Sequence, residues 1–414
     1  MNCRHCGHLL ENVFLDLGHA PPSNAYLNAA SLHLPEITYP LKLYVCAECW
    51  LVQTEDHARA DQLFDSDYAY FSSTSQTWLD HARRYFEMAQ QRFALNARSH
   101  VVEIASNDGY LLRHFVEAGI PCLGIEPTAS TAAAAEALGI RVRREFFGQD
   151  VARRLAAEGL QADLIIGNNV YAHVPDINDF TLGLKAALKG GGTITLEFPH
   201  LLRMIEGTQF DTAYHEHFSY LSLYTADRIF ASADLRLFDV EELTTHGGSL
   251  RIYASHRDDP RENTEGVGRI LAEELRQGLR SIETYRRFQA RAERVKNDLV
   301  VFLMDQKRGG RKVAAYGAAA KGNTLLNFAG VKRDLVEYVC DAAPSKQGKY
   351  MPGSRIPILA PTALSERRPD TVLILPWNIA NEIDLQLTAM GHSDTPCLVA
   401  VPHLRYVNRN RPRG

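Results

Sequence analysis

The sequence contains no apolar run close to the roughly 20 residues that a membrane-spanning helix needs. Its start, MNCRHCGHLLENVFL, also lacks the basic region and long apolar core of a secretory signal. We therefore expect a cytoplasmic protein that has no membrane partner.

A strong excess of charge of one sign is also absent. The 414 residues carry 45 basic and 49 acidic side chains, which gives a formal net charge of −4. This balance gives no general attraction to phosphate polymers, so we expect no nucleic acid partner. The length allows two or three domains, and we expect a monomer or a weak oligomer.

Cysteine is scarce, but four of the seven cysteines form two close pairs. Cys3 and Cys6 make one C-x2-C pair, and Cys46 and Cys49 make the other. Four thiolates complete a tetrahedral zinc shell and leave no open position for catalysis. The sequence therefore predicts a structural zinc whose binding helps to fold a small module at residues 1–58.

Apolar strands alternate with helical patterns over the centre of the chain. A helical pattern, preceded by a loop, lies within residues 59–98, which we interpret as a helical linker. The parallel-strand candidates that follow are VVEIA (101–105), CLGIEP (122–127), DLIIGNN (163–169) and GTITLEFP (192–199). This alternation predicts an α/β, doubly wound Rossmann-like sheet at residues 99–257.

The last third of the chain has two parts. Apolar residues at spacings of three and four between 264 and 308 predict one long amphipathic helix, which makes 258–308 a connecting segment. The alternation of strands and helices then resumes with KVAAYG at 312–317. We therefore predict a second parallel sheet in a C-terminal domain at residues 309–414.

The turn after the first central strand lacks the G-x-G-x-x-G glycines that let a pyrophosphate approach. It suits a cofactor without phosphates, and S-adenosylmethionine meets that description. Glu126, at the end of the second strand, lies where a carboxylate holds ribose hydroxyls in such folds. The candidate cofactor-binding residues are Glu103, Ala105, Asn107, Asp108, Gly109, Glu126, Pro127, Asn168 and Asn169.

Residues 213–220 read AYHEHFSY and concentrate groups that carry protons. On a strand, His215 and His217 would share a face and could hold a metal. A histidine near glutamate and tyrosine could instead serve as an acid or base near neutral pH. A polar cluster without a chemical role is the third interpretation, and this segment alone leaves all three open.

Beyond these patterns, the chain resembles the sugar C-methyltransferases that act on nucleotide-linked deoxysugars. The resemblance covers nearly the full length, and its most specific parts are YHEHFSY (214–220), HGGSLR (246–251), YGAAAKGNTLLN (316–327) and DAAPSKQGKYMPG (341–353). It implies a class I methyltransferase core between a zinc-binding N-terminal module and a Rossmann-like C-terminal domain.

The resemblance also implies particular site residues. The family's Tyr-x-Glu-His run falls on Tyr214, Glu216 and His217, and its other tyrosine and histidine fall on Tyr70 and His173. The implied reaction moves a methyl group from S-adenosylmethionine to a carbon beside the keto group of a nucleotide-linked deoxysugar. His200, in EFPHL, replaces a tyrosine of the family, and we expect it to alter the sugar pocket.

Methylation of carbon requires a carbanion, which forms beside a carbonyl when a base removes a proton. We predict that His217 is this base, that Glu216 orients or polarises it, and that Tyr214 or Tyr70 donates to the enolate oxygen. The alternatives are O- or N-methylation of a small molecule and a zinc-module methyltransferase that acts on nucleic acid.

Two further residues are candidates for contact with the sugar nucleotide. His246 belongs to HGGSLR, and Lys321 precedes a predicted helix whose N-terminus would favour phosphate.

Overall fold

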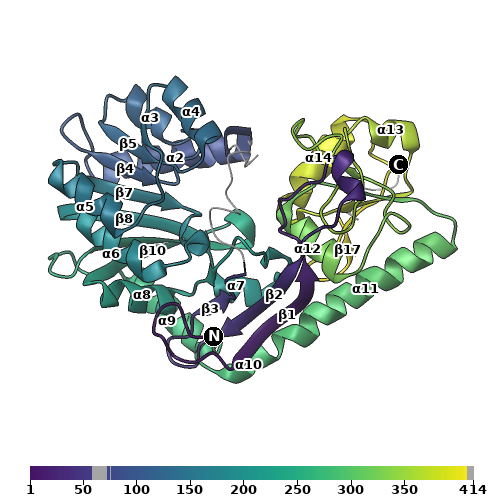
Figure 1. Ribbon diagram of the computed structural model, residues 1–414, viewed down its shortest axis with the longest axis horizontal. Coiled ribbons are helices and arrows are strands. Elements are labelled where there is room, and N and C mark those ends of the chain that lie inside the picture. Colours follow the sequence, from purple (N-terminus) through teal and green to yellow (C-terminus); the bar gives the residue numbers. More distant parts are fainter. Residues whose placement is uncertain (58–71, 75, 408–414) are drawn as a thin grey trace.

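The computed structural model describes residues 1–57, 72–74 and 76–407. Strands in this part of the chain form sheets of four, seven and six strands. Figure 1 shows the seven-stranded and six-stranded sheets in two lobes, with β1 and β2 below and between them. No helix among the described residues combines the length and the apolar character needed to cross a membrane.

The seven-stranded sheet contains all four strands predicted for the central domain. Its neighbouring strands are, in order, β10 (Leu235–Leu243), β11 (Ser249–His256), β8 (Leu188–Pro199), β7 (Ala162–Asn168), β4 (Val101–Ile104), β5 (Cys122–Ile125) and β6 (Arg141–Arg143). Strands β4 to β8 pair in parallel, whereas β10 and β11 add an antiparallel edge. The carboxyl ends of the parallel strands therefore meet at one edge, where such sheets bind ligands.

Helices cover both faces of this sheet, so its strands are buried on both sides. One face packs against α5 (Gln149–Ala157), α6 (Ile177–Ala187) and α8 (Leu223–Ser232). The other face packs against α2 (Gln76–Arg92), α3 (Leu112–Glu117) and α4 (Ala129–Ala137). Short elements at the carboxyl edge are η3 (Tyr171–His173), α7 (Leu201–Glu206), η4 (Phe210–Thr212) and η5 (Thr245–Gly247).

Helix α2 differs from the predicted linker. Its buried residues Ala82, Tyr85 and Ala89 share a hydrophobic cluster with Val101 of β4 and Leu112 of α3. The helical pattern was correctly read, but its apolar stripe is buried by the central sheet, which makes α2 a part of the central domain.

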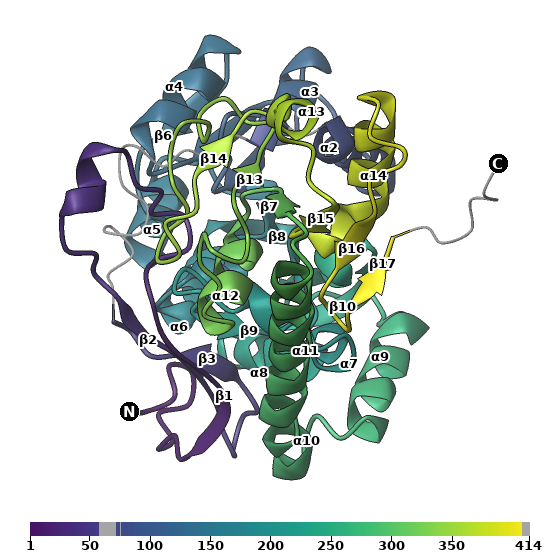
Figure 2. The same cartoon turned by 90° about the vertical axis from the view of Figure 1, so that its right-hand side faces the viewer.

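The connecting segment is also different from the prediction, because the single long helix is three helices. They are α9 (Glu265–Arg276), α10 (Ile282–Arg286) and α11 (Phe288–Arg308). Gly278 has a φ of +78°, a left-handed conformation that ends α9 and that glycine adopts without steric cost. Figure 2 shows α10 and α11 leading from below the central sheet to the C-terminal domain.

The C-terminal domain contains the predicted second sheet. Its neighbouring strands are, in order, β14 (Ile358–Leu359), β13 (Val339–Cys340), β12 (Val313–Tyr316), β15 (Thr371–Ile374), β16 (Cys397–Val399) and β17 (Arg405–Tyr406). All pairs are parallel except β16 with β17. Its helices are α12 (Ala320–Phe328), α13 (Ala363–Arg367), η6 (Trp377–Ile379) and α14 (Ala380–Ala389).

The four-stranded sheet joins the N-terminal module to the AYHEHFSY segment. Its order is β1 (Asn12–Ala20), β2 (Tyr39–Val45), β3 (Val52–Thr54) and β9 (Ser219–Tyr220). Strand β9 is the end of AYHEHFSY and pairs antiparallel with β3. The N-terminal module therefore holds one end of the segment that carries the candidate catalytic residues.

Residues 21–38, which we call the strap, connect β1 to β2 by way of the C-terminal domain. Leu27 and Tyr350 exchange backbone hydrogen bonds of 3.0 and 2.8 Å. Farther along the strap, Glu36 accepts a hydrogen bond of 2.6 Å from the backbone N–H of Gly353. The strap, which includes η1 (Ala30–His33), lies against the C-terminal domain in Figure 1.

Candidate active site

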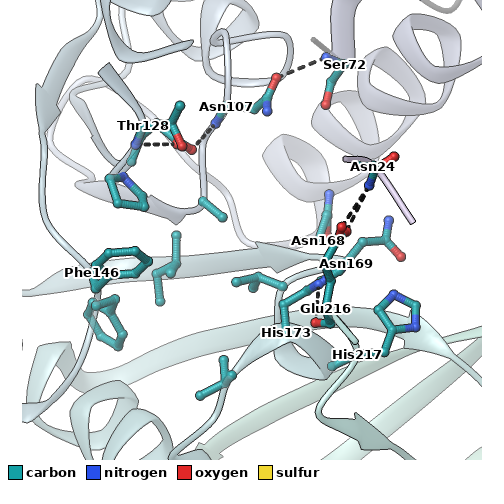
Figure 3. A pocket seen from close by; sticks show the side chains of 18 of the residues that line it. Asn24, Ser72, Asn107, Thr128, Phe146, Asn168, Asn169, His173, Glu216 and His217 are labelled. Carbon is teal, nitrogen blue, oxygen red and sulfur yellow. Dashed lines mark hydrogen bonds between the residues drawn. The ribbon is translucent and has the colours of Figure 1, made fainter. Parts of the chain in front are cut away.

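A cavity of about 540 Å³ lies where the three domains meet. The strap contributes Asn24, the carboxyl end of β7 contributes Asn168, and the first turn of α12 contributes Lys321. Figure 3 shows Thr128 and Phe146 toward one end of this cavity and His173, Glu216 and His217 toward the other. The two ends are described in turn.

At the first end, Glu126 is held by the backbone. One carboxylate oxygen accepts a hydrogen bond of 2.9 Å from the N–H of Asn107, and the other accepts one of 2.9 Å from Thr128 (Figure 3). Each carboxylate oxygen has two lone pairs, so both oxygens can still accept hydrogen bonds from a diol. The geometry fits the predicted contact with ribose.

Several buried polar atoms in or behind the wall of the cavity have no hydrogen-bond partner among the described residues. They are Glu103 Oε2, Asp108 Oδ1 and both amide atoms of Asn168. Burial, together with the negative charges of Asp108 and Glu126, raises the pKa of Glu103 well above its usual value. A nearby cationic ligand would lower that pKa, and S-adenosylmethionine carries both an ammonium and a sulfonium charge.

The turn between β4 and α3 is left-handed at several residues. Ala105 and Asn107 have φ values of +56° and +50° and line the cavity. Gly109, with φ +78°, packs outside the cavity, and a Cβ there would lie 2.4 Å from Ile140 Cδ1. Gly109 is therefore required by its close packing against α4 and Ile140 rather than by contact with a ligand.

The predicted cofactor residues thus separate into two groups. Those that line the cavity are Ala105, Asn107, Glu126, Pro127, Asn168 and Asn169. Glu103, Asp108 and Gly109 lie behind this surface, where Glu103 and Asp108 place carboxyl groups and Gly109 allows close packing.

The second end of the cavity brings together most of the predicted catalytic and substrate-binding residues. The cavity is lined there by His173, Tyr214, Glu216, His217, His246 and Lys321. Tyr70 lies outside the described residues.

The backbone of AYHEHFSY is irregular before β9. The N–H of His217 donates to the carbonyl of Tyr214 at 3.0 Å, which closes a turn and sends the two histidines in different directions. His215 Nε2 lies 3.3 and 3.2 Å from the carbonyl oxygens of Tyr39 and Pro40. His215 therefore anchors the turn to the start of β2. This arrangement is consistent with the prediction that His217, and not His215, is the general base.

His217 is buried and surrounded by aromatic rings. Its ring centre lies 4.1 Å from that of Tyr214 and 4.5 Å from that of His173. Burial, followed by the positive charges that His173 and His246 can carry, lowers the pKa of His217 well below its usual value. The neutral form, which can accept a proton, therefore predominates near neutral pH.

The Glu216 carboxylate is bonded to Asn24, a residue that the sequence did not indicate as part of the site. The Asn24 amide donates to both carboxylate oxygens of Glu216, at 3.0 and 2.9 Å (Figure 3). Burial raises the pKa of Glu216 to about 7, and the Asn24 hydrogen bond opposes this rise. The backbone carbonyl of Glu216, and not its carboxylate, accepts a hydrogen bond of 2.8 Å from His173 Nδ1.

His246 lies in η5 of the central domain, and Lys321 lies in α12 of the C-terminal domain. His246 has a φ of +55°, a strained conformation for a non-glycine residue, and burial lowers its pKa to about 4. The Lys321 amine donates to Asn378 at 2.7 Å and lies 4.7 Å from the Trp377 ring centre. Burial lowers the pKa of Lys321, while the charge of Asp211 opposes this shift.

The expectation for His200 was wrong. His200 is buried outside the residues that line the cavity, and its Nε2 lies 2.7 Å from Glu274 Oε1. Glu274 also accepts hydrogen bonds from the backbone N–H groups of Leu223 and Tyr224, at the start of α8. His200 therefore helps to join α9 to the central domain.

Two lining residues were missed by the sequence reasoning. Trp78 stacks on His81 at 4.8 Å, and the His81 ring bonds to Glu197 at 2.9 Å. Trp78 belongs to the helical pattern that was assigned to the linker, so recognising α2 as part of the central domain would have indicated it. Asn24 has no comparable signal, because only the path of the strap brings it to Glu216.

The four paired cysteines lie together at the base of the N-terminal module. Sγ–Sγ distances are 3.5 Å for Cys3–Cys49 and 3.5 Å for Cys6–Cys46, and all four sulfurs lie within 4.8 Å of one another. Sulfurs of a tetrahedral zinc shell would lie about 3.8 Å apart, given Zn–S bonds of about 2.3 Å. The donor set and its spacing fit zinc.

Among the described residues, these cysteines are the one group of three or more potential ligands close enough to share a metal. The alternative in which His215 and His217 hold a metal is therefore not supported by the geometry, since their rings diverge.

Comparisons with known proteins agree with this geometry. The C-methyltransferase NovU of Streptomyces niveus is 34% identical over 381 residues, which cover 92% of this chain and 90% of that protein. The chain belongs to this C-methyltransferase family. Family models match a zinc-binding domain at residues 3–64, a methyltransferase domain at 78–240 and a C-methyltransferase C-terminal domain at 244–402.

Solved structures of methyltransferases match part of this chain at lower similarity. The 1,6-didemethyltoxoflavin-N1-methyltransferase of Burkholderia thailandensis is 14% identical, with a TM-score of 0.37, and the match covers 50% of this chain and 95% of that one. An S-adenosylmethionine-dependent methyltransferase of Anabaena variabilis is 13% identical, with a TM-score of 0.36, and the match covers 43% of this chain and 85% of that one.

The family and the cavity together establish the main chemistry. The protein is a C-methyltransferase that uses S-adenosylmethionine, on a class I methyltransferase fold with an N-terminal zinc module. The carbon acceptor and the role of each site residue are matters for proposal.

Proposed function

We propose that the protein transfers a methyl group from S-adenosylmethionine to a carbon beside the keto group of a nucleotide-linked 4-keto deoxysugar. One observation carries the proposal: the carboxylate that suits a ribose and the cluster that can move protons line a single cavity. A substrate carbon can therefore meet the methyl group and a base at the same time.

His217 is the proposed general base. Its neutral ring takes the proton from the carbon beside the ketone, and the resulting enolate carbon then takes the methyl group. Tyr214, whose ring centre is 4.1 Å from that of His217, is the proposed donor to the enolate oxygen. The His173 ring centre is 4.5 Å from that of His217, and His173 Nδ1 donates to the Glu216 carbonyl, which fixes the turn.

Lys321 and His246 are proposed to contact the sugar nucleotide. Lys321 lies in the first turn of α12, where backbone N–H groups and the positive end of the helix favour phosphate. Ala319, Ala320 and Lys321 line the cavity from the C-terminal domain, so the nucleotide would lie between that domain and the strap. The sugar would then reach His217.

The test is a screen of nucleotide-linked 4-keto sugars for a mass gain that depends on S-adenosylmethionine. We expect a methylated product with at least one of them, and solvent deuterium should enter the carbon next to the ketone when the methyl donor is omitted. Methylation at oxygen or nitrogen, without exchange at carbon, would refute the enolate chemistry.

A further inference from the structure

Asn24 connects the strap to the proton-moving end of the cavity. Its amide nitrogen lies 3.0 and 2.9 Å from the two carboxylate oxygens of Glu216. A single amide that contacts both oxygens restricts the carboxylate in position and in rotation. Asn24 reaches this place from the chain between β1 and β2, far from Glu216 in sequence.

The C-terminal domain holds Asn24 in place from both sides along the strap. Asn323 of α12 donates to the carbonyl of Ser23 at 2.6 Å. The Tyr26 hydroxyl donates to the carbonyl of Ala318 at 2.5 Å. The residues before and after Asn24 are thus fixed to the domain that also supplies Lys321.

We propose that Asn24 is a positioning residue that fixes the Glu216 carboxylate in the cavity and favours its ionised form. The inference rests on the proposed function, in which Glu216 belongs to the active site. An amide N–H donates to a carboxylate and thereby stabilises the charged form against the cost of burial. Asn24 therefore decides over which pH range the cavity holds a negative charge beside His217.

Other titratable groups line the cavity with Glu216 or lie near it. They are Tyr26 of the strap, His173 of η3, Tyr214 and His217 of the same turn, Lys321 of α12 and Lys346 after β13. The amines of Lys321 and Lys346 donate to Asn378 and to the Ala318 carbonyl. Burial and the Asn24 hydrogen bond are the two causes of the pKa of Glu216, which is about 7.

Two substitutions remove the Asn24 donor in different ways. Asn24→Ala deletes the amide, and Asn24→Asp keeps its shape but presents a second carboxylate to Glu216. The protonation midpoint of Glu216 should rise by about one pH unit in Asn24→Ala and further in Asn24→Asp, since two adjacent carboxylates resist joint ionisation. Asn28→Ala, an exposed change in the same strap, should leave the midpoint in place.

The direct measurement is isotope-edited infrared titration of protein labelled with 13C in the glutamate carboxyl group, with Glu216→Gln as the blank. It needs no substrate, so it is independent of the reaction assigned to the cavity. The affinity for S-adenosylmethionine serves as a check that each variant is folded. An unchanged Glu216 midpoint in folded Asn24→Ala and Asn24→Asp would overturn the inference.

The kinetic measurement is the pH dependence of kcat/KM. In Asn24→Ala, the acid limb should move upward, with a loss of about tenfold below the midpoint and recovery at higher pH. An equal loss at every pH would indicate a purely structural role and would overturn the inference. If the wild type methylates no nucleotide keto sugar, the proposed function fails while the infrared result still decides the role of Asn24.

Discussion

Glu126 binds its surroundings through backbone N–H groups, which leaves its remaining lone pairs directed to the cavity. Glu126→Ala should weaken binding of S-adenosylmethionine by about 1.5–3 kcal/mol, or roughly 10- to 150-fold in Kd, because a charged acceptor for the ribose is lost. Calorimetry is the measurement. Glu136→Ala, which removes an exposed ion pair with Arg144, is the matched control.

An unchanged affinity for the cofactor in Glu126→Ala would contradict the assignment of this end of the cavity. The fold should survive the change, since β5 and α4 keep their apolar contacts.

His217 and His215 are two residues apart but have different surroundings. His217→Asn should lower the rate about 10²- to 10⁴-fold with nearly normal cofactor affinity, as expected for loss of a positioned base. His215→Asn should lower the melting temperature more than the rate, because His215 binds the Tyr39 and Pro40 carbonyls. Single-turnover methyl transfer and thermal unfolding measure the two effects.

If His217→Asn kept both methyl transfer and exchange of the substrate carbon's proton, another base would be required. His173 and Glu216 are the next candidates, and the pKa of Glu216 near 7 suits a base at neutral pH. Equal losses for both histidine variants, together with a second bound metal, would restore the metal interpretation of AYHEHFSY.

At the scale of elements, the N-terminal sheet makes the zinc module part of the site. Its strand β3 pairs with β9, and Thr54 donates to the carbonyl of His217 at 3.2 Å. We predict one tightly bound zinc per chain. Removing it should lower methyl transfer while leaving cofactor affinity largely intact, because β9 and the strap depend on the module but Glu126 does not.

Metal analysis and thiol titration test the zinc prediction. Chelation should expose the four clustered thiols, and Cys49→Ser should lose zinc, whereas Cys122→Ser should retain it. Freshly purified protein without zinc and with freely reactive clustered thiols would rule out the assignment.

For the whole molecule, Asp211 joins the central and C-terminal domains. Trp377 Nε1 donates to Asp211 Oδ2 at 2.7 Å, and burial raises the pKa of Asp211 to about 6, although Lys321 and Trp377 oppose the rise. In the unfolded chain the Asp211 carboxyl group loses its proton at its usual pKa, whereas in the folded chain it keeps the proton until about pH 6. The free energy of unfolding therefore falls as pH rises between these two values. Above pH 6 the folded protein bears the full free-energy cost of burying the ionised Asp211 carboxylate.

Asp211→Asn should therefore be more stable than the wild type above pH 6, by about 1–3 kcal/mol, and equally stable near pH 4. Asparagine keeps an oxygen that can accept from Trp377. Urea unfolding at several pH values is the measurement. A stability difference that does not change with pH would show that Asp211 is ionised throughout.

The fold follows largely from periodicity in the sequence. The strands β4, β5, β7 and β8 are short apolar runs bounded by turns, and this local pattern is sufficient to locate them. The break between α9 and α10 was missed because apolar spacing continues across Gly278, where the backbone is left-handed. The role of α2 was missed because an apolar stripe on a helix does not indicate which surface of the protein buries it.

Local sequence was sufficient to predict the zinc module, the Rossmann-like central sheet and the family, since each depends on residues close together in the chain or on motifs. The tertiary structure alone decided that the strap brings Asn24 to Glu216, that the rings of His215 and His217 diverge, and that His200 lies outside the cavity. These features depend on contacts between distant segments, and contact energies between such segments leave no periodic trace in the chain.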